Sequence, residues 1–211
     1  VNLSSLMGNC DAAHLGDWFS YNQDAQVGRD ALAAKNLLEK VGGGQAGFDF
    51  TKISATGEQL SANTISWSCV LDNHTGLMWE KKTDDNGLHD KNNVYTWYNP
   101  DAQSNGGKAG YENNGKNTYQ FVNTVNSQGL CGYKDWRLPT LEELHSIVNY
   151  GTFNPSVDTT YFPNTLSYWY WTSSSSASSN ELVRVTTFLN GSDNINYKSD
   201  NSYIYLVRFA K

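Results

Sequence analysis

Short runs in which hydrophobic and polar residues alternate recur along this chain, and they predict β-strands. The predicted strands are residues 47–53, 67–71, 77–79, 182–189 and 203–209. The second and third runs flank the polar stretch 72–76, a pattern typical of a hairpin. The last two runs are separated by the turn 190–193. An antiparallel sheet is therefore expected, with strands collected toward the C-terminus.

Other segments have helical character, namely residues 30–40, 119–125 and 140–148. The first holds strong helix formers and stops before the glycines at 42–44. The last begins with a capping-box signature, Thr140 and Glu143, followed by a hydrophobic stripe of Leu141, Leu144, Ile147 and Val148. Polar, glycine-containing loops are predicted at 81–93 and 101–116. Together these elements predict an α+β fold with an antiparallel sheet and two or three helices.

Composition narrows the class of protein. The 211 residues fit one large domain, or one domain with an N-terminal extension. A net charge of −6 argues against binding to nucleic acid or a membrane surface, because both require clustered Lys and Arg. No hydrophobic run approaches the length of roughly 18 residues that spans a membrane, so we expect a soluble chain without direct membrane insertion. Low charge with many Asn, Ser, Thr, Gly and aromatic residues is typical of secreted or surface-displayed bacterial domains, including outer-membrane lipoproteins.

Motifs for catalysis or metal binding are missing from the sequence. The four histidines are scattered, and no nucleophile elbow or phosphate-binding glycine loop is found. Residues 84–90 carry oxygen ligands around Gly87, but they lack the spacing of a calcium-binding EF-hand and its closing Glu. We interpret this loop as a solvated turn, with calcium as the lesser alternative, and expect no other cofactor and no metal. The three cysteines are simplest to explain as one disulfide and one spare thiol.

Several motifs resemble one family of bacterial domains. They include residues 69–80 (CVLDNHTGLMWE), 129–140 (GLCGYKDWRLPT), 154–158 (NPSVD) and 170–173 (YWTS). The pattern is similar to the family named for the C-terminal domain of the Legionella collagen-like protein, and it covers most of the chain. This resemblance implies a C-type-lectin-like fold of the formylglycine-generating type, found in secreted or surface proteins that include adhesins.

The resemblance also suggests structural roles for individual residues. It implies that Trp79 and Trp136 pack in the core, that Asp135 pairs with Arg137, that Pro139 starts the capped helix, and that Cys69 and Cys131 form a disulfide. Cys10 then has no evident partner. Formylglycine-generating enzymes need reactive cysteines in their C-terminal part, and this chain has none after Cys131. We therefore expect no enzymatic activity.

The C-terminal segment has the composition of a binding surface. From residue 172 to 205, 22 of 34 residues are Ser, Thr, Asn, Asp or Tyr, the residue types that antibodies use for adaptable contacts. Leu182, Phe188, Ile195 and Leu206 are expected to anchor its strands. The segment resembles that of the variable proteins diversified by retroelements, although Asn- and Ser-rich strands also suit this family without a retroelement. The predicted ligand contacts are Tyr168, Trp169, Tyr170, Ser173, Ser175, Ser176, Ser178, Asn180, Arg184, Asn190, Ser192, Asp193, Asn194, Asn196, Tyr197, Ser199, Asp200, Asn201, Tyr203 and Tyr205.

These observations lead to one main hypothesis and three alternatives. Residues 1–60 are interpreted as an N-terminal extension packed on a ligand-binding domain at 61–211. The leading hypothesis is a surface-displayed or secreted module that binds a protein or glycan through its C-terminal face. The first alternative is an adhesin domain for sulfated, glycosaminoglycan-type polysaccharide, which the acidic charge disfavours. An enzyme and a purely structural, trimerising head are the others, and the oligomeric state stays open.

Overall fold

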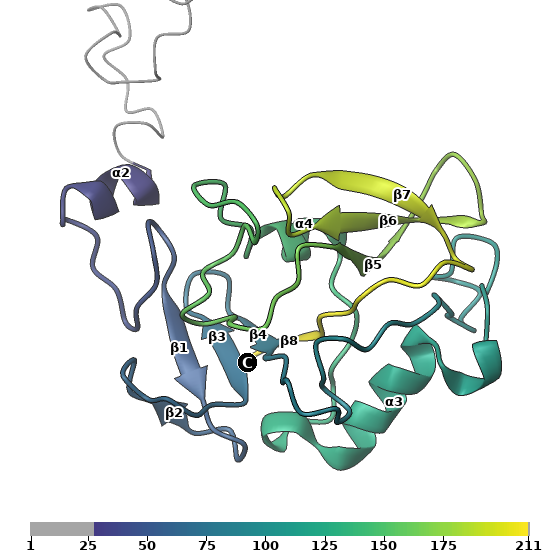
Figure 1. Ribbon diagram of the computed structural model, residues 1–211, viewed down its shortest axis with the longest axis horizontal. Helices are drawn as coiled ribbons and strands as arrows, with labels where there is room; N and C mark the ends of the chain where they lie inside the picture. Colours follow the sequence, from purple (N-terminus) through teal and green to yellow (C-terminus); the bar gives the residue numbers. More distant parts are fainter. Residues whose placement is uncertain (1–27, 211) are drawn as a thin grey trace, which may run out of the picture.

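The protein has an α+β fold built around two antiparallel sheets, as the computed structural model shows for residues 28–210 (Figure 1). The helices are α2 (Arg29–Ala34), α3 (Thr118–Gln128) and α4 (Leu141–His145), with short 3₁₀ turns at Asn113–Gly115 and Leu130–Gly132. The strands are β1 (Phe50–Ile53), β2 (Gln59–Leu60), β3 (Cys69–Asp72), β4 (Leu77–Glu80), β5 (Trp169–Ser175), β6 (Leu182–Thr187), β7 (Asp193–Tyr197) and β8 (Val207–Phe209). The predicted fold class is confirmed.

The larger sheet has the strand order β2-β1-β3-β4-β8. Its centre is the predicted β3–β4 hairpin, which is confirmed. Asp72 closes the turn, because its carboxylate accepts hydrogen bonds from the His74 amide at 2.9 Å and the Thr75 hydroxyl at 2.7 Å. β8 pairs with β4, so the C-terminus returns to the middle of the fold. β1 and β2 belong to the segment expected as an extension, yet they are hydrogen-bonded into this same sheet.

The smaller sheet has the order β5-β6-β7, and the predicted contact residues lie in its strands or in the segments that adjoin them. β6 matches the predicted strand 182–189, but β7 was not predicted. The expected strand 203–209 was too long, because only Val207–Phe209 forms a regular strand. Before it, Tyr203 makes a single parallel bridge to Tyr170. The chain between β7 and β8 is therefore held along β5 rather than in a ladder of its own.

The helices predicted at 119–125 and 140–148 are confirmed as α3 and α4, although α4 already ends at His145. Thr140 accepts a hydrogen bond from the Glu143 amide at 3.2 Å, and Glu143 accepts one from the Thr140 amide at 2.8 Å, which completes the capping box of α4. α3 starts at the Asn117 cap and stops at Gly129, which adopts φ of 80°. α2 is shorter than predicted, because the chain leaves the helix at Asn36 with φ of 56°.

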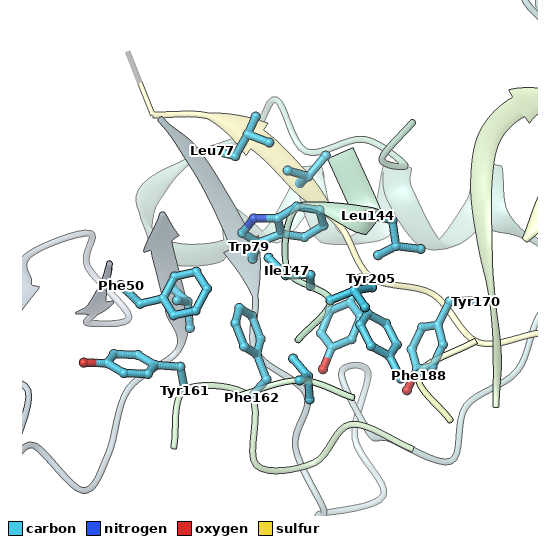
Figure 2. Packing of buried hydrophobic residues seen from close by; sticks show 14 residues of the cluster. Phe50, Leu77, Trp79, Leu144, Ile147, Tyr161, Phe162, Tyr170, Phe188 and Tyr205 are labelled. Atoms are coloured by element: carbon cyan, nitrogen blue, oxygen red, sulfur yellow. The ribbon is translucent and has the colours of Figure 1, made fainter. Parts of the chain in front are cut away.

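The core consists of two clusters rich in aromatic residues. In the first, Phe162 lies between Phe50 and the stacked pair Tyr170 and Tyr205, and Trp79 packs in the same cluster (Figure 2). The second surrounds the buried Trp97, Trp136 and Trp171 and includes the Cys69–Cys131 disulfide. The predicted disulfide and the predicted burial of Trp79 and Trp136 are confirmed. Cys10 and His14 lie outside the described residues.

One predicted ion pair is wrong. Asp135 pairs with Arg208, at 2.7 Å, and Arg137 pairs with Glu143, at 2.6 Å. The cause is the backbone bridge between Arg137 and Val207, which brings β8 beside this segment and places Arg208 near Asp135. Glu143, as the capping residue of α4, is then in reach of Arg137.

No helix among residues 28–210 has the length and apolar character needed to cross a membrane.

Candidate functional site

The serine-rich run 173–179, which follows the aromatic residues 168–171, is held by hydrogen bonds to neighbouring segments. Ser173 lies in β5, and its amide donates to the Pro139 carbonyl at 2.7 Å. The Ser174 hydroxyl accepts a hydrogen bond from the Leu141 amide at 3.0 Å, at the start of α4. In the loop that follows, the Ser176 and Ser178 hydroxyls are 2.8 Å apart and the Ser176 amide donates to Leu182. Strand and helix contacts therefore hold the run in place.

A buried lysine ties a second loop to this region. The Lys198 side chain is fully buried, and its ammonium donates to the carbonyls of Asn105 at 2.8 Å and Lys108 at 2.6 Å. The ammonium also lies 4.6 Å from the centre of the Trp97 ring. Burial lowers the pKa of Lys198, and nearby Glu181 opposes this effect. Lys108 in turn forms an ion pair with Glu181, just before β6. The loop of residues 101–110 is therefore attached to the β5–β6–β7 sheet.

β6 and β7 together present a mixed polar and apolar surface. The cross-strand pairs Thr186–Asp193, Arg184–Ile195 and Leu182–Tyr197 share one face of the hairpin, since side chains alternate along each strand. Arg184 forms an ion pair with Asp193, and its hydrogen bond lowers the pKa of Asp193. Ile195 is 40% exposed and Tyr197 is 60% exposed. The predicted role of Ile195 as a buried anchor is therefore wrong, because Ile195 lies on the exposed face of the edge strand β7.

Strand alternation divides the predicted contact residues of β7 between two faces. Asn194 and Asn196 pair with Val185 and Val183, whose side chains are fully buried. The Asn196 amide approaches the Ser202 hydroxyl at 3.4 Å. Asp193 and Tyr197 belong to the opposite face. The predicted contact residues of β7 therefore form two strips. Asp193 and Tyr197 lie on the outward face, and Asn194 and Asn196 lie on the face toward the segment that follows β7.

A ladder of four tyrosines connects this region to the core. Tyr168 is 60% exposed, and its ring lies 5.7 Å from that of Tyr203. Tyr203 lies 5.5 Å from Tyr170, which stacks on Tyr205 at 5.2 Å. Burial raises the pKa of Tyr170 well above its usual value, and likewise that of Tyr205. The rings of Tyr168 and Tyr203 therefore form an aromatic surface that rests on the buried rings of Tyr170 and Tyr205.

The structure divides the predicted contacts by exposure. Tyr170 and Tyr205 are buried in the first core cluster and cannot touch a ligand, so these two assignments are corrected. Half-buried positions are Trp169, Ser173, Ser175, Ser176, Asn196 and Tyr203. Exposed positions are Tyr168, Ser178, Asn180, Arg184, Asn190, Ser192, Asp193, Asn194, Tyr197, Ser199, Asp200 and Asn201. The sequence had no means of separating these groups, because Tyr occurs in both the core and the surface.

A groove of about 620 Å³ lies outside this set, between α3, the start of α4 and β8. Its walls include Tyr98, Tyr119, Val122, Leu138 and Phe209. Polar groups come from Asn99, Arg137, Thr140, Glu143 and Ser173. Tyr98 and Tyr119 meet edge to face at 6.1 Å, and Phe209 lies 5.0 Å from the Arg137 guanidinium. Sequence reasoning missed this groove because the motif at 129–140 was interpreted as scaffold.

The groove contains one ion pair, Arg137–Glu143, whose opposite charges cancel. Arg137 donates to both oxygens of Glu143, at 2.7 Å and 2.6 Å. Burial alone would raise the pKa of Glu143, but the hydrogen bonds from Arg137 and the Thr140 amide lower it overall. The groove therefore offers aromatic walls and hydrogen-bonding groups without net charge.

The loop considered for calcium uses its carboxylates internally. Asp90 accepts hydrogen bonds from the amides of Asp85, Asn86 and Asn92, at 2.7 to 2.8 Å. These bonds lower the pKa of Asp90. In the part of the chain that the structure describes, no three His, Cys, Asp or Glu side chains are grouped as metal ligands would be.

Comparison with known proteins identifies the family. The family model described as the Lcl C-terminal domain matches residues 68–208. The chain belongs to this family. The match begins just before β3 of this Lcl C-terminal domain and ends within β8, so it includes the disulfide, the whole β5–β6–β7 sheet and the groove except for Phe209. No curated protein and no solved structure matches the chain.

Proposed function

We propose that this Lcl C-terminal domain is a non-enzymatic binding module that holds a protein or glycan ligand on its β5–β6–β7 sheet and the adjoining loops. The observation that carries the proposal is the exposed strip of Arg184, Asp193, Ile195 and Tyr197, supported by buried residues on the same strands. Val183, Val185 and Trp171 are fully buried, so these strands present their outer residues from a rigid base. Preorganised surfaces of this kind bind with little loss of conformational entropy.

The experiment compares ligand capture by the wild-type chain and by two single variants. Protein and glycan arrays identify a ligand, and its affinity is then measured for Tyr197→Ala and Tyr168→Ala. Each exposed tyrosine is expected to contribute about tenfold in affinity. Ile65→Ala is the matched control, because Ile65 is 95% exposed but lies in the segment between β2 and β3. A ligand that binds both tyrosine variants as tightly as the control contradicts the proposal.

The aromatic groove supports a second binding function at a separate place. Sugars bind where aromatic faces meet a few hydrogen-bonding groups, and the groove combines Tyr119 and Phe209 with the neutralised Arg137–Glu143 pair. We assign it to an uncharged saccharide residue. Tyr119→Ala should abolish such binding, whereas Tyr197→Ala should leave it unchanged, and a glycan array probed with both variants separates the two sites.

Binding to sulfated polysaccharide is the weaker alternative for the same sheet. It requires free cations, but Arg184 is paired with Asp193 on the exposed strip, and the chain carries a net charge of −6. Retention on immobilised heparin at physiological salt, lost on Arg184→Ala, would favour this alternative.

We also propose display at the cell surface or secretion, with a C-type-lectin-like topology. The Cys69–Cys131 disulfide supports an oxidising compartment. Surface protease treatment of intact cells tests the location, and an experimental structure of the chain tests the topology. A near-identical downstream repeat that differs at adenines would support diversification of residues 172–205 by a retroelement.

A further inference from the structure

The outer edge of β7 has backbone groups that point away from the sheet. The Thr187 amide donates to Ser192 at 2.9 Å and the Lys198 amide donates to Glu181 at 2.9 Å, both in the register of the β6–β7 pairs. Hydrogen-bonded and non-bonded pairs alternate in an antiparallel ladder. Asn194 and Asn196 are therefore bonded to β6, and the N–H and C=O groups of Asp193, Ile195 and Tyr197 face outward.

Little in the described chain meets these groups. β7 is the last strand of its sheet, and Figure 1 shows it along the outer rim of the molecule. The Tyr197 carbonyl accepts one bond from Asp200 at 2.8 Å, and the Asp193 amide lies near its own carboxylate. Among residues 28–210, no backbone group is bonded to the outward N–H and C=O of Ile195. The centre of the edge is thus open to solvent.

This edge has little of the usual protection against pairing. Natural edge strands are kept apart by charged side chains, Pro, a bulge or very short length, and the one charge on β7, Asp193, is paired with Arg184. β7 has the sequence Asp-Asn-Ile-Asn-Tyr and stays in unbroken register with β6 over five residues. In the other sheet, the edge strand β2 has only two residues, and β8 is partly covered by the bridge from Arg137 to Val207.

We propose that an extended segment of a partner polypeptide adds to β7 as a fourth strand. The inference rests on the proposed function and names its ligand class, because regularly spaced N–H and C=O groups are matched by another extended backbone rather than by sugar hydroxyls.

The side chains of β7 define the composition of the partner segment. Ile195 and Tyr197 are exposed beside the half-buried Leu182, which favours apolar residues at alternating positions of the added strand. Arg184 and Asp193 neutralise each other, so the strip requires no excess charge in its partner.

The first test uses linear 12-residue peptides from a displayed library, selected on the full chain. The tightest peptide is remade with a single N-methyl group at each position in turn. In an added strand, every second N–H bonds to β7, so methylation should weaken binding about tenfold at alternate positions and little between them. Amide hydrogen exchange at Ile195 should slow when the peptide binds, whereas Asn194 and Asn196, already bonded to β6, should change little.

The second test removes the donor from the protein. Ile195→Pro deletes an outward N–H without breaking a bond to β6, and it should weaken peptide binding about tenfold or more. Ile195→Ala is the matched control, because it keeps the N–H while shortening the side chain. Thermal unfolding of both variants checks that the sheet is intact, and the methylation scan needs no variant at all.

The outcomes separate this inference from the proposed function. A selected peptide that shows no alternation on methylation and no protection of Ile195 overturns strand addition, even if Tyr197→Ala weakens its binding and so supports the face itself. A library that yields no binder also overturns it. If glycans bind and their binding depends on Tyr168 and Tyr197, the β5–β6–β7 sheet remains the binding site. Strand addition by a partner polypeptide is then overturned.

Discussion

Glu80 illustrates how strongly one buried charge depends on its neighbours. Its side chain is fully buried, and its carboxylate accepts hydrogen bonds from Lys82 at 2.8 Å, His89 at 2.7 Å and the Leu206 amide at 3.1 Å. Burial alone would raise the pKa of Glu80, but Lys82 and His89 lower it overall. Burial lowers the pKa of Lys82, and the Glu80 carboxylate opposes this. The network joins β4, the following loop and the segment before β8.

Removal of the Glu80 charge should destabilise the fold severely. In Glu80→Gln the ammonium of Lys82, only 6% exposed, loses its anionic partner. Such a change typically costs about 3–5 kcal/mol of unfolding free energy. Urea denaturation measures the effect, with Glu142→Gln on the exposed side of α4 as the control. A loss below about 1 kcal/mol would show that Lys82 finds another partner.

Acid should weaken the same network. A carboxyl group with a lowered folded-state pKa contributes stability above its unfolded value of about 4.3, and this contribution is lost as the pH falls through the folded pKa. The urea midpoint of the wild type should therefore decrease between pH 5 and pH 3, as is usual for folded carboxylates. Glu80→Gln should show a shallower decrease. Identical pH profiles would assign the acid sensitivity to the other carboxylates.

Local elements were predicted best where side chains of the element itself determine its ends. The capping box of α4 and the polar turn of the β3–β4 hairpin satisfy their own backbone groups, so both are visible in the sequence. β7 was missed because Asp193–Tyr197 is short, has Ile195 as its one aliphatic residue and gains its strand geometry from pairing with β6. An edge strand of this kind has no strong periodic signal.

Loss of the α4 cap should have a moderate effect. Thr140→Ala removes the hydroxyl that accepts from the Glu143 amide, at a cost of about 1 kcal/mol. Thr140→Ser keeps the acceptor and serves as the control, with an expected change of a few tenths of a kcal/mol at most. Chemical denaturation measures both variants. Equal losses would indicate that the methyl group of Thr140, rather than its cap, stabilises the helix.

At the scale of the whole molecule, the Cys69–Cys131 disulfide links β3 to the end of α3. The bond closes a loop of 62 residues, and both cysteines belong to the second core cluster. It therefore joins the larger sheet to the segment that carries Trp136 and Arg137, which contribute to the core and the groove respectively.

Reduction of this disulfide should lower stability substantially. Loop-closure entropy for a loop of this length corresponds to about 4 kcal/mol. The guanidinium midpoint of the wild type should fall in the presence of reductant, whereas a Cys69→Ala, Cys131→Ala double variant should start low and show no further change. A reduced wild type as stable as the oxidised form would contradict this account.

Sequence alone determined the α+β class, the hairpin, helices α3 and α4 and, through family motifs, the disulfide and the buried Trp79 and Trp136. These features depend on local hydrogen bonds or on motifs that are contiguous in the chain. Tertiary structure decided which tyrosines are buried, which acid Arg137 pairs with, where the groove lies and that β7 forms an open edge. Each of these depends on segments far apart in sequence, such as Tyr170 with Tyr205 or Arg137 with Val207, whose contacts no local pattern records.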